Sequence, residues 1–207
     1  MRLRRCGSDA VLVEVDSLDE VDAVRAALAD AAGDGRLPDL AELVPAARTV
    51  LAAVRPGSGG LAALREVLAG VDLNAAVGRD SREVVLPVHY DGPDLALVAE
   101  TAGIGVAEVA ALHSGVEYSV AFSGFAPGFG YLVGLPDALC QPRLDQPRTK
   151  VPAGSVGIAG EFTGAYPRSS PGGWRLIGRT DAVLFDSHRD RPALLTPGDR
   201  VRFEVRA

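Results

Sequence analysis

Residues 123–174 read SGFAPGFGYLVGLPDALCQPRLDQPRTKVPAGSVGIAGEFTGAYPRSSPGGW, and this stretch decides what kind of fold the chain adopts. Ten glycines and seven prolines occupy its first 51 residues, a composition often found in disordered segments. Six aromatic residues, which disordered segments lack, are interleaved with them: Phe125, Phe129, Tyr131, Phe162, Tyr166 and Trp174. Glycine permits positive φ and proline fixes φ, so the stretch predicts rigid, irregular backbone anchored by aromatic rings. We therefore expect a shaped surface here.

The composition predicts a globular protein with one large or two small domains. The chain has 207 residues, of which 47% are hydrophobic and 23% charged, with a net charge of -6. This acidic balance gives no general attraction to nucleic acid or to anionic membranes, so we expect neither as a partner. The sequence also lacks the run of about 18 apolar residues that a membrane-spanning helix needs and has no signal-peptide pattern. The default expectation is a cytoplasmic protein.

Familiar catalytic and metal-binding motifs are missing from the sequence. It has two distant cysteines, Cys6 and Cys140, and three histidines, so we expect no metal site and no disulfide. The phosphate-loop, dinucleotide-binding, nucleophile-elbow and HExxH patterns are not found. Without a Met-Lys pair, the chain carries no biotin. Any enzymatic activity must therefore depend on Arg, Tyr, Ser, Asp, backbone amides and at most a few histidines.

The distribution of aromatic residues predicts two domains with a boundary near residue 90. None occurs before Tyr90, whereas nine of the eleven lie between Tyr118 and Phe185. In the first part, Ser17 and Glu20 have capping-box spacing and open a helix that ends at Gly33. A second helix is expected over residues 61–69, and strands are expected over residues 2–5, 10–15, 49–54 and 82–90. This order predicts an α+β sandwich, with two helices on one side of a sheet.

The second part begins with a helical pair and continues as β structure. Helices are expected over residues 95–103 and 106–114, joined by a short glycine-containing turn. A DNA-reading helix-turn-helix is disfavoured, because no Arg or Lys occurs from Asp91 to Pro142. Strands are expected over residues 118–122, 155–159, 174–177, 182–185 and 201–205. Many short strands with rich turns predict a closed barrel or a sandwich.

Two loops carry candidate ligand-binding residues. Arg148 and Lys150 lie in a proline-braced loop with two hydroxyl residues, and residues 166–174 combine an aromatic ring, Arg168, two serines and Gly172-Gly173. Guanidinium, ammonium and backbone amides bind anions, so an anionic ligand is the natural hypothesis. Solvated loop cations are the simpler alternative. The two loops could converge on one ligand.

Histidine offers a further candidate at position 113. His113 closes a predicted helix just before the first barrel strand, where the helix C-terminus stabilises imidazolium. A capping role toward the terminal carbonyls and a functional role are equally compatible with this position. His89 and His188 are interpreted as structural or solvated.

Three segments resemble the signature segments of the 5-oxoprolinase B-subunit family. They are GFAPGFGYLVGLP from Gly124 to Pro136, PRTKVPAGSVGIAG from Pro147 to Gly160, and YPRSSPGGWRLIGRT from Tyr166 to Thr180. That family includes Kip-type inhibitors of a sensor histidine kinase and resembles one half of the carboxyltransferase region of urea carboxylase, also known as allophanate hydrolase subunit 1. The resemblance is specific over residues 82–207. Gly130 departs from the pattern, which expects a side chain at this position.

The resemblance implies a fold and a partner. It implies a ferredoxin-like α+β domain over residues 1–90, followed over residues 91–207 by a cyclophilin-like β-barrel with a leading helical pair. It also implies a pseudo-symmetric heteromer with the family's C-subunit, with the ligand site between the two, and a third component, the A-subunit. The family's complex uses ATP to cleave 5-oxo-L-proline to L-glutamate, and this chain would be inactive alone. The alternatives are a Kip-type kinase inhibitor and a detached half of a urea carboxylase.

The resemblance also assigns candidate site residues. The candidates for catalysis are His113, Arg148, Lys150 and Arg179, with His113 serving in proton transfer or substrate contact. The candidates for binding substrate or ATP are Phe125, Pro127, Gly128, Tyr131, Tyr166, Ser169, Ser170, Gly172, Gly173 and Trp174. ATP, with magnesium, is expected at the level of the complex, and a metal site on this chain is not expected.

Overall fold

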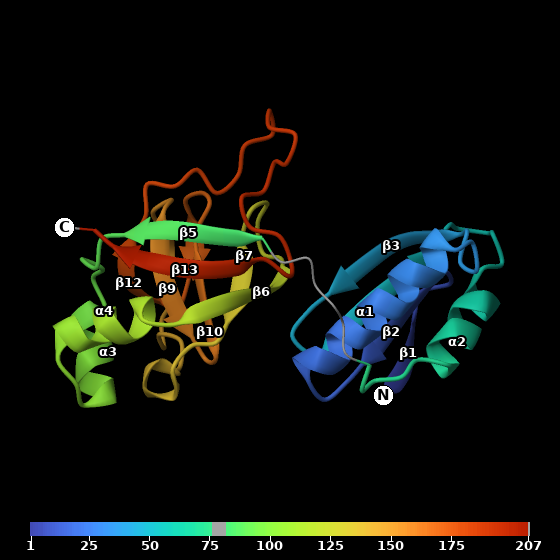
Figure 1. Ribbon diagram of the computed structural model, residues 1–207, viewed down its shortest axis with the longest axis horizontal. Coiled ribbons are helices and arrows are strands. Elements are labelled where there is room, and N and C mark those ends of the chain that lie inside the picture. The colour runs from blue at the N-terminus through green and yellow to red at the C-terminus, as the bar shows by residue number, and fades with distance from the viewer. Residues whose placement is uncertain (76–81, 207) are drawn as a thin grey trace. The chain divides into compact units, whose positions relative to one another are not determined.

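The chain divides into two compact units. A computed structural model describes residues 1–75 and 82–206, and contacts separate Met1–Arg79 from Asp80–Ala207. Figure 1 shows the helices and strands of each unit.

The first unit consists of one antiparallel sheet and two helices. Its strands are β1 (Arg2–Cys6), β2 (Ala10–Glu14), β3 (Leu40–Pro45) and β4 (Thr49–Val54), and its helices are α1 (Leu18–Gly33) and α2 (Leu61–Ala69). The strands lie in the order β1-β2-β4-β3. Because β2 and β3 both run antiparallel to β4, they are parallel to each other, and α1 connects them across the inserted β4. This is a split βαβ arrangement.

Both helices cover the same face of this sheet. Val11 and Val13 of β2, Ala52 of β4, and Leu64 and Leu68 of α2 belong to one buried cluster. The expected α+β sandwich with two helices on one side is therefore confirmed. The expected capping interaction is present too, since the Ser17 side chain accepts a hydrogen bond from the Glu20 nitrogen at 3.2 Å.

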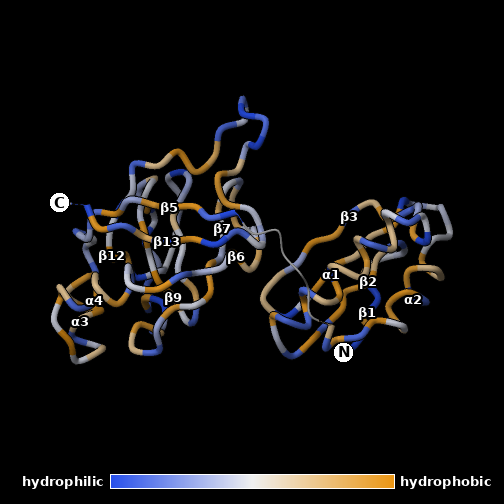
Figure 2. The backbone as a smooth tube through the Cα atoms, in the orientation of Figure 1, coloured by the Kyte–Doolittle hydropathy of each residue, from blue (hydrophilic) through white to orange (hydrophobic). Residues whose placement is uncertain are grey.

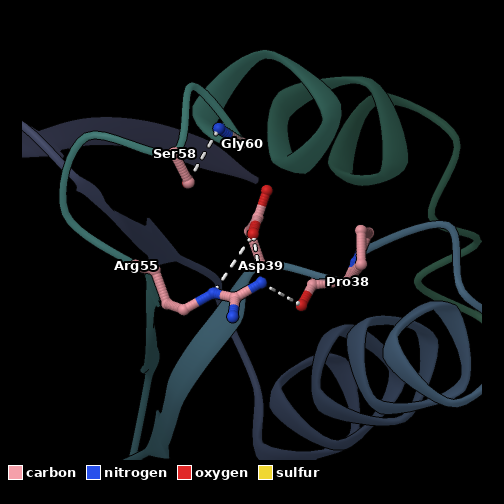
Figure 3. A network of polar contacts seen from close by, with 5 residues as sticks. All are labelled: Pro38, Asp39, Arg55, Ser58 and Gly60. Carbon is pink, nitrogen blue, oxygen red and sulfur yellow. Dashed lines mark hydrogen bonds and ion pairs between the residues drawn. The ribbon is translucent and has the colours of Figure 1, made fainter.

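A polar network joins the start of β3 to the turn before α2 (Figure 3). The Arg55 guanidinium donates to the Asp39 carboxylate, with Nη2 at 2.6 Å from Oδ1, and to the Pro38 carbonyl at 3.3 Å. Nearby, the Gly60 N–H donates to the Ser58 hydroxyl at 3.2 Å. The groups are exposed, so the ion pair contributes at most about 1 kcal/mol and serves mainly to fix the turn.

The second unit is built on a seven-stranded sheet with two helices. Its helices are α3 (Leu95–Ala102) and α4 (Val106–Ser114), with a short 3-10 helix at Asp137–Leu139. Its strands are β5 (Glu83–Val88), β6 (Glu117–Ser123), β7 (Gly130–Val133), β8 (Arg148–Val151), β9 (Ser155–Ala159), β10 (Phe162–Ala165), β11 (Ser170–Gly172), β12 (Arg175–Arg179) and β13 (Arg200–Val205). The large sheet has the order β12-β9-β10-β7-β6-β13-β5, and β8 pairs with β11 separately. Helix α3 packs on β12, and α4 packs on β13.

The large sheet curls until the segment after β5 meets β12. His89 and Arg179 exchange two backbone hydrogen bonds, each of 2.9 Å, and the N–H groups of Gly92 and Asp94 donate to the carbonyls of Ile177 and Leu176. Residues 89–94 thus pair with β12 and lead directly into α3. We call this backbone contact the seam.

Glycine is required on both sides of the seam. A Cβ on Gly92 would overlap the backbone of Leu176 and Ile177, and a Cβ on Gly178 would lie 2.5 Å from the His89 carbonyl oxygen. Neither contact is with a flexible side chain that could move away. The two backbones approach this closely only because both positions lack a side chain.

Two of the expected strands differ in the structure: one belongs to the other unit, and one does not form. The strand expected over residues 82–90 forms β5, but β5 pairs with β13 and belongs to the second unit, so the predicted boundary near residue 90 is wrong. Residues 182–185 do not form a strand. They begin an irregular excursion between β12 and β13, which has a single bridge between Phe185 and Ala193 and a hydrophilic tip (Figure 2).

Helices α3 and α4 are more apolar than α1 and α2 of the first unit. Within the described ranges, 1–75 and 82–206, no single helix is long and apolar enough to cross a membrane, and α3 and α4 meet the length and hydropathy requirement only as a pair bent by 91°.

We expect Gly92→Ala to destabilise the second unit by about 3 kcal/mol, because the added methyl group must displace the backbone of β12. Denaturant unfolding followed by tryptophan fluorescence measures this, since Trp174 precedes β12. Gly105→Ala is the control, because nothing lies within 4 Å of a Cβ there. Equal losses in the two variants would show that the seam is not tightly packed.

Candidate functional site

The glycine- and proline-rich stretch carries a second, aromatic core. Phe129 is the centre of this cluster, with ring centroids 5.3 Å from both Tyr166 and Trp174 and 5.0 Å from Tyr131. All three pairs meet edge to face, the geometry that aromatic rings prefer. The predicted anchoring of irregular backbone by aromatic rings is confirmed.

Phe125 is the exposed member of this aromatic region and has an unusual backbone. Its φ is +66°, and it is the sole non-glycine residue with positive φ among the residues that the structure describes. The Ala126 N–H donates to the Gly124 carbonyl at 2.7 Å, so Phe125 occupies the centre of a three-residue turn. The residue is 57% exposed, and its ring contacts the Phe129 and Tyr166 rings edge to face at centroid distances of 5.4 and 6.0 Å. A large apolar residue held in a strained turn and presented to solvent is typical of a binding surface.

Gly128 fixes the other end of the same loop. Its φ is +84°, and a Cβ there would lie 2.6 Å from the Phe185 Cβ and 2.8 Å from the Leu184 carbonyl oxygen. The loop therefore packs against the base of the excursion. Pro127, between Phe125 and Gly128, is exposed. Of the residues predicted in this loop, Phe125 and Pro127 face solvent, whereas Gly128 is a packing requirement.

Arg148 is held by a buried carboxylate. Its Nη2 lies 2.6 Å from Asp94 Oδ1, and the side chains are 28% and 8% exposed. The other Asp94 oxygen accepts from the Leu176 N–H at 2.7 Å, just beyond the seam. Asp94 immediately precedes α3, so the seam, α3 and Arg148 are joined at one carboxylate. This geometry fixes the orientation of the guanidinium.

A second buried network lies beneath the loop that precedes Arg148. Gln141 is 4% exposed; its oxygen accepts from Arg175 Nη1 at 2.5 Å, and its nitrogen donates to the Val98 carbonyl at 2.9 Å. Arg175 Nη1 also donates to the Thr101 hydroxyl at 2.8 Å. Because Val98 and Thr101 both belong to α3, this helix supports residues 141–148 from below.

Strands β8 and β11 bring Arg148 beside the Gly172-Gly173 pair. Arg148 lies opposite Gly172, and Ser170 lies opposite Val151. A Cβ on Gly172 would lie 2.6 Å from the Tyr166 hydroxyl, so this phenol rests on the glycine backbone. Tyr166 is itself 2% exposed and supports the site from beneath. The two loops thus lie side by side at Arg148 and Gly172, as a shared ligand site would require.

The remaining predicted residues occupy three kinds of position. Lys150 and Ser169 are exposed. Trp174 is buried in the aromatic core. Arg179 lies at the seam and pairs with Asp91 at 2.9 Å, both half exposed, with no ring or hydrogen-bond contact to the aromatic cluster among the described residues.

His113 belongs to the core, which corrects its predicted role. It is 0% exposed, and its two nitrogens lie 2.7 Å from the Tyr90 hydroxyl and 2.9 Å from the Thr163 hydroxyl. Thr163 donates its only hydroxyl hydrogen to the Gly157 carbonyl, so it must accept from Nε2–H, and Nδ1 accepts from Tyr90. The imidazole is neutral and fully bonded. It neither caps the α4 carbonyls nor has any surface for a substrate.

Arg143 is a candidate site residue that the sequence patterns did not single out. It is exposed and follows Gln141 by two residues, and the next residue, Leu144, donates its N–H to the Gly173 carbonyl at 2.8 Å. The signal was present in the sequence, since Pro142-Arg143 repeats the Pro147-Arg148 pair within the same stretch. No cluster of three or more potential metal ligands occurs within the described part of the chain.

Comparison with known proteins identifies the class. Residues 1–195 match the family model described as "Carboxyltransferase domain, subdomain C and D". A relative from Escherichia coli O157:H7, named as the B-subunit of 5-oxoprolinase, is 47% identical over 171 residues, covering 81% of this chain and 78% of the relative. The chain therefore belongs to the carboxyltransferase subdomain C and D family and, within it, to the 5-oxoprolinase B-subunit family.

Solved structures support the fold. The crystal structure of TTHA0988 superposes with a TM-score of 0.82 at 35% identity, covering 97% of this chain and 40% of that one. The Kluyveromyces lactis urea amidolyase superposes with a TM-score of 0.76 at 20% identity, over 99% of this chain and 15% of that one. Our chain thus spans about two fifths of TTHA0988. At its low identity, the urea amidolyase shows a shared fold alone.

Burial of neutral His113 should make stability depend on pH. Burial lowers the pKa of His113 to about 3, from an ordinary value of 6.5. Between these values the unfolded chain binds the extra proton, so the contribution of His113 is complete above pH 6.5 and is lost as pH falls toward 3. From pH 6.5 to 5, this amounts to roughly 2 kcal/mol of unfolding free energy. Urea titrations of wild type and His113→Gln should show a shallower pH dependence in the variant, whereas an unchanged slope would contradict the prediction. His188→Gln is the control for loss of a histidine.

Because the turn at Phe125 is strained, we expect removal of its ring to cost little unfolding free energy. Left-handed φ costs a residue with a side chain about 1–2 kcal/mol, and asparagine tolerates this region better. We expect Phe125→Asn to change the unfolding free energy by less than about 1 kcal/mol, because relief of strain offsets the lost ring contacts. Phe162→Asn, in the same aromatic cluster with ordinary φ, should cost about 3 kcal/mol. Equal losses by denaturant unfolding would show that Phe125 is not strained.

Proposed function

We propose that this chain is the B-subunit of an ATP-dependent 5-oxoprolinase that cleaves 5-oxo-L-proline to L-glutamate. The observation that carries the proposal is the 47% identity over 171 residues to the E. coli relative with this name. Since that name denotes one component of an assembly, we propose that the chain works only in a complex, with a C-subunit of related barrel architecture and a lactam-binding A-subunit. The cytoplasm, where ATP is available, is the proposed location.

We also propose the finer fold assignment that the resemblance implies. The first unit would be a ferredoxin-like domain. Strands β2, β4 and β3 belong to its split βαβ arrangement, and the fourth strand, β1, lies at the edge of the sheet and precedes them in the chain. The second unit would be a cyclophilin-like barrel, and the curled seven-stranded sheet supports this assignment.

The chemistry calls for groups that stabilise negative charge. A lactam is unreactive toward water, and transfer of the terminal phosphoryl group of ATP to its amide oxygen would create a good leaving group. Water would then add to the ring carbon, and the C–N bond would open with a proton passing to nitrogen, which leaves an acyl phosphate. A second water would hydrolyse the acyl phosphate, so ATP, two waters and 5-oxoproline would become ADP, phosphate and glutamate. Guanidinium, ammonium and backbone N–H groups are suited to the developing oxyanion.

The cations and amides around Gly172 are our candidates for this work. Arg148, fixed by Asp94, would contact the oxyanion, while Lys150, the hydroxyls of Ser169 and Ser170, and the Gly172-Gly173 amides would bind phosphoryl oxygens. Arg179 at the seam would act on a more distant charge. Magnesium would arrive with ATP at the level of the complex.

The exposed Phe125 ring fits a site shared with a partner. Its strained turn holds the ring in solvent rather than in the aromatic core. A partner surface that covers it would exclude water from the neighbouring cations and strengthen their electrostatic effect.

Reconstitution tests the proposal. The purified chain should release no glutamate from 5-oxoproline, whereas addition of the A-subunit and the C-subunit should give equimolar ADP and glutamate. Omission of any one component should abolish the reaction, and Arg148→Ala should abolish it while leaving assembly intact on size-exclusion chromatography. Absence of 5-oxoproline-dependent ADP release from the complete mixture would refute the proposed function.

A further inference from the structure

Two arginines from different segments reach the same glycine pair. Arg148 lies in β8 opposite Gly172. The Leu144 N–H bonds to the Gly173 carbonyl at 2.8 Å, which places the backbone of the adjacent Arg143 close to this pair. Both arginines therefore extend from backbone that is paired with Gly172-Gly173.

The Arg148 side chain and the backbone of Arg143 are both fixed by their surroundings. Arg148 is held by Asp94, as described above. Arg143 lies between two anchored residues, because the buried Gln141 side chain is bonded to Val98 of α3 and to Arg175, and Leu144 is bonded to Gly173. A short loop fixed at both ends confines the backbone of Arg143. This differs from an ordinary solvated arginine on a mobile loop.

Positive charge at this place is only partly compensated. Arg143 makes no ion pair or hydrogen bond with the described residues, and Asp94 divides its two oxygens between Arg148 and the Leu176 N–H. Arg148 Nη1 is shielded from solvent yet has no hydrogen-bond partner in the described parts of the chain. A shielded donor without an acceptor is costly, which leaves the charge of the partly exposed Arg148 guanidinium incompletely satisfied. The site stands out in a chain with a net charge of -6.

The positive charge of Arg143 acts on two tyrosines of the aromatic cluster. Burial raises the pKa of the Tyr131 and Tyr166 hydroxyls, and the positive charge of Arg143 opposes this increase in pKa at both of them. Arg148 has the same opposing effect on the pKa of Tyr166. The Tyr166 hydroxyl is thus influenced by both arginine charges, and the Tyr166 ring contacts the exposed Phe125 ring at a centroid distance of 6.0 Å.

We infer that Arg143 and Arg148 form a two-arginine site for an oxyanion beside the Phe125 ring, with Arg143 contacting the ligand and Asp94 acting as the positioning residue for Arg148. The ligand chemistry is a carboxylate or a phosphoryl group, either of which accepts paired N–H donors from a guanidinium. The choice of ligands rests on the proposed function: the anion would be the carboxylate of 5-oxoproline or a phosphoryl group derived from ATP. The site itself is a property of this chain.

Binding to the isolated full-length chain tests this inference separately from activity. ¹⁵N-labelled protein is titrated with 5-oxo-L-proline, with inorganic phosphate and with 2-pyrrolidinone, the uncharged lactam that lacks the carboxylate. We expect saturable shifts of amides in residues 141–148 and 172–173 with at least one anion and none with 2-pyrrolidinone. Saturation by 5-oxoproline alone would identify the carboxylate source, and saturation by phosphate would identify the phosphoryl source. If neither anion binds, or if 2-pyrrolidinone binds as well as 5-oxoproline, the inference is wrong.

Variants assign the two arginines. Arg143→Gln should weaken anion binding about tenfold or more, since it removes a charge-assisted contact. Arg191→Gln is the matched control, because Arg191 is also exposed and carries no ion pair among the described residues, but lies in the excursion between β12 and β13. Equal affinities for wild type and Arg143→Gln would remove Arg143 from the site. This result would not affect the proposed function, because that function is tested by the activity of the complex.

The positioning role of Asp94 needs a readout that simple destabilisation would not change. Asp94→Asn should weaken anion binding about tenfold, and Asp94→Glu should restore part of it. Because Asp94 also bonds the Leu176 backbone, Arg148→Lys provides a second variant that keeps the charge and the ion pair but removes the paired donors. It should weaken binding by a similar factor with an unchanged midpoint of unfolding. Wild-type affinity in Asp94→Asn and in Arg148→Lys would refute the role.

Discussion

The backbone contact at the seam is the constraint on which the second unit depends. The two glycines, Gly92 and Gly178, allow residues 89–94 to lie directly on β12 and curl the sheet. The same segment leads into Asp94 and α3, so the closure of the sheet also determines where α3 lies. Helix α3 in turn supports Arg148 through Asp94 and the loop of Arg143 through Gln141. The orientation of the candidate ligand-binding groups thus follows from a close approach of backbone.

Local sequence patterns predicted the elements that local physics determines. Helix α1 begins after Ser17 and ends at Gly33, because a side-chain cap and a glycine mark its ends. The aromatic anchors of the glycine- and proline-rich stretch were also predictable, since six large rings in such a segment must be buried together or presented to a ligand. Arg148 and the Gly172-Gly173 pair are candidates for a similar reason, because a cation and free amides in proline-braced loops indicate anion binding.

Local sequence patterns do not predict contacts between residues that are distant in the chain. The strand pattern of β5 is clear, but nothing local shows that it pairs with β13, more than a hundred residues later. Strand β3 was missed because a register shift between Leu40 and Glu42 interrupts its alternation. His113 was misjudged because its burial depends on Tyr90 and Thr163, which reach it from other elements. Asp94 and Gln141 act through buried contacts 54 and 34 residues away along the chain, so their importance is visible only in three dimensions.

The parallel pairing of β5 with β13 has a consequence for how this unit can be joined to other chains. The first strand of the unit runs alongside the last, with Glu83 opposite Arg200 and Val88 opposite Val205. Parallel strands start at the same end, so the polypeptide enters the unit at one end of this two-stranded ribbon and leaves it at the other, about 17 Å away. A domain or tag fused after Arg206 would therefore begin at the far end from residue 82. Domains can therefore be fused before and after this unit without their linkers lying side by side.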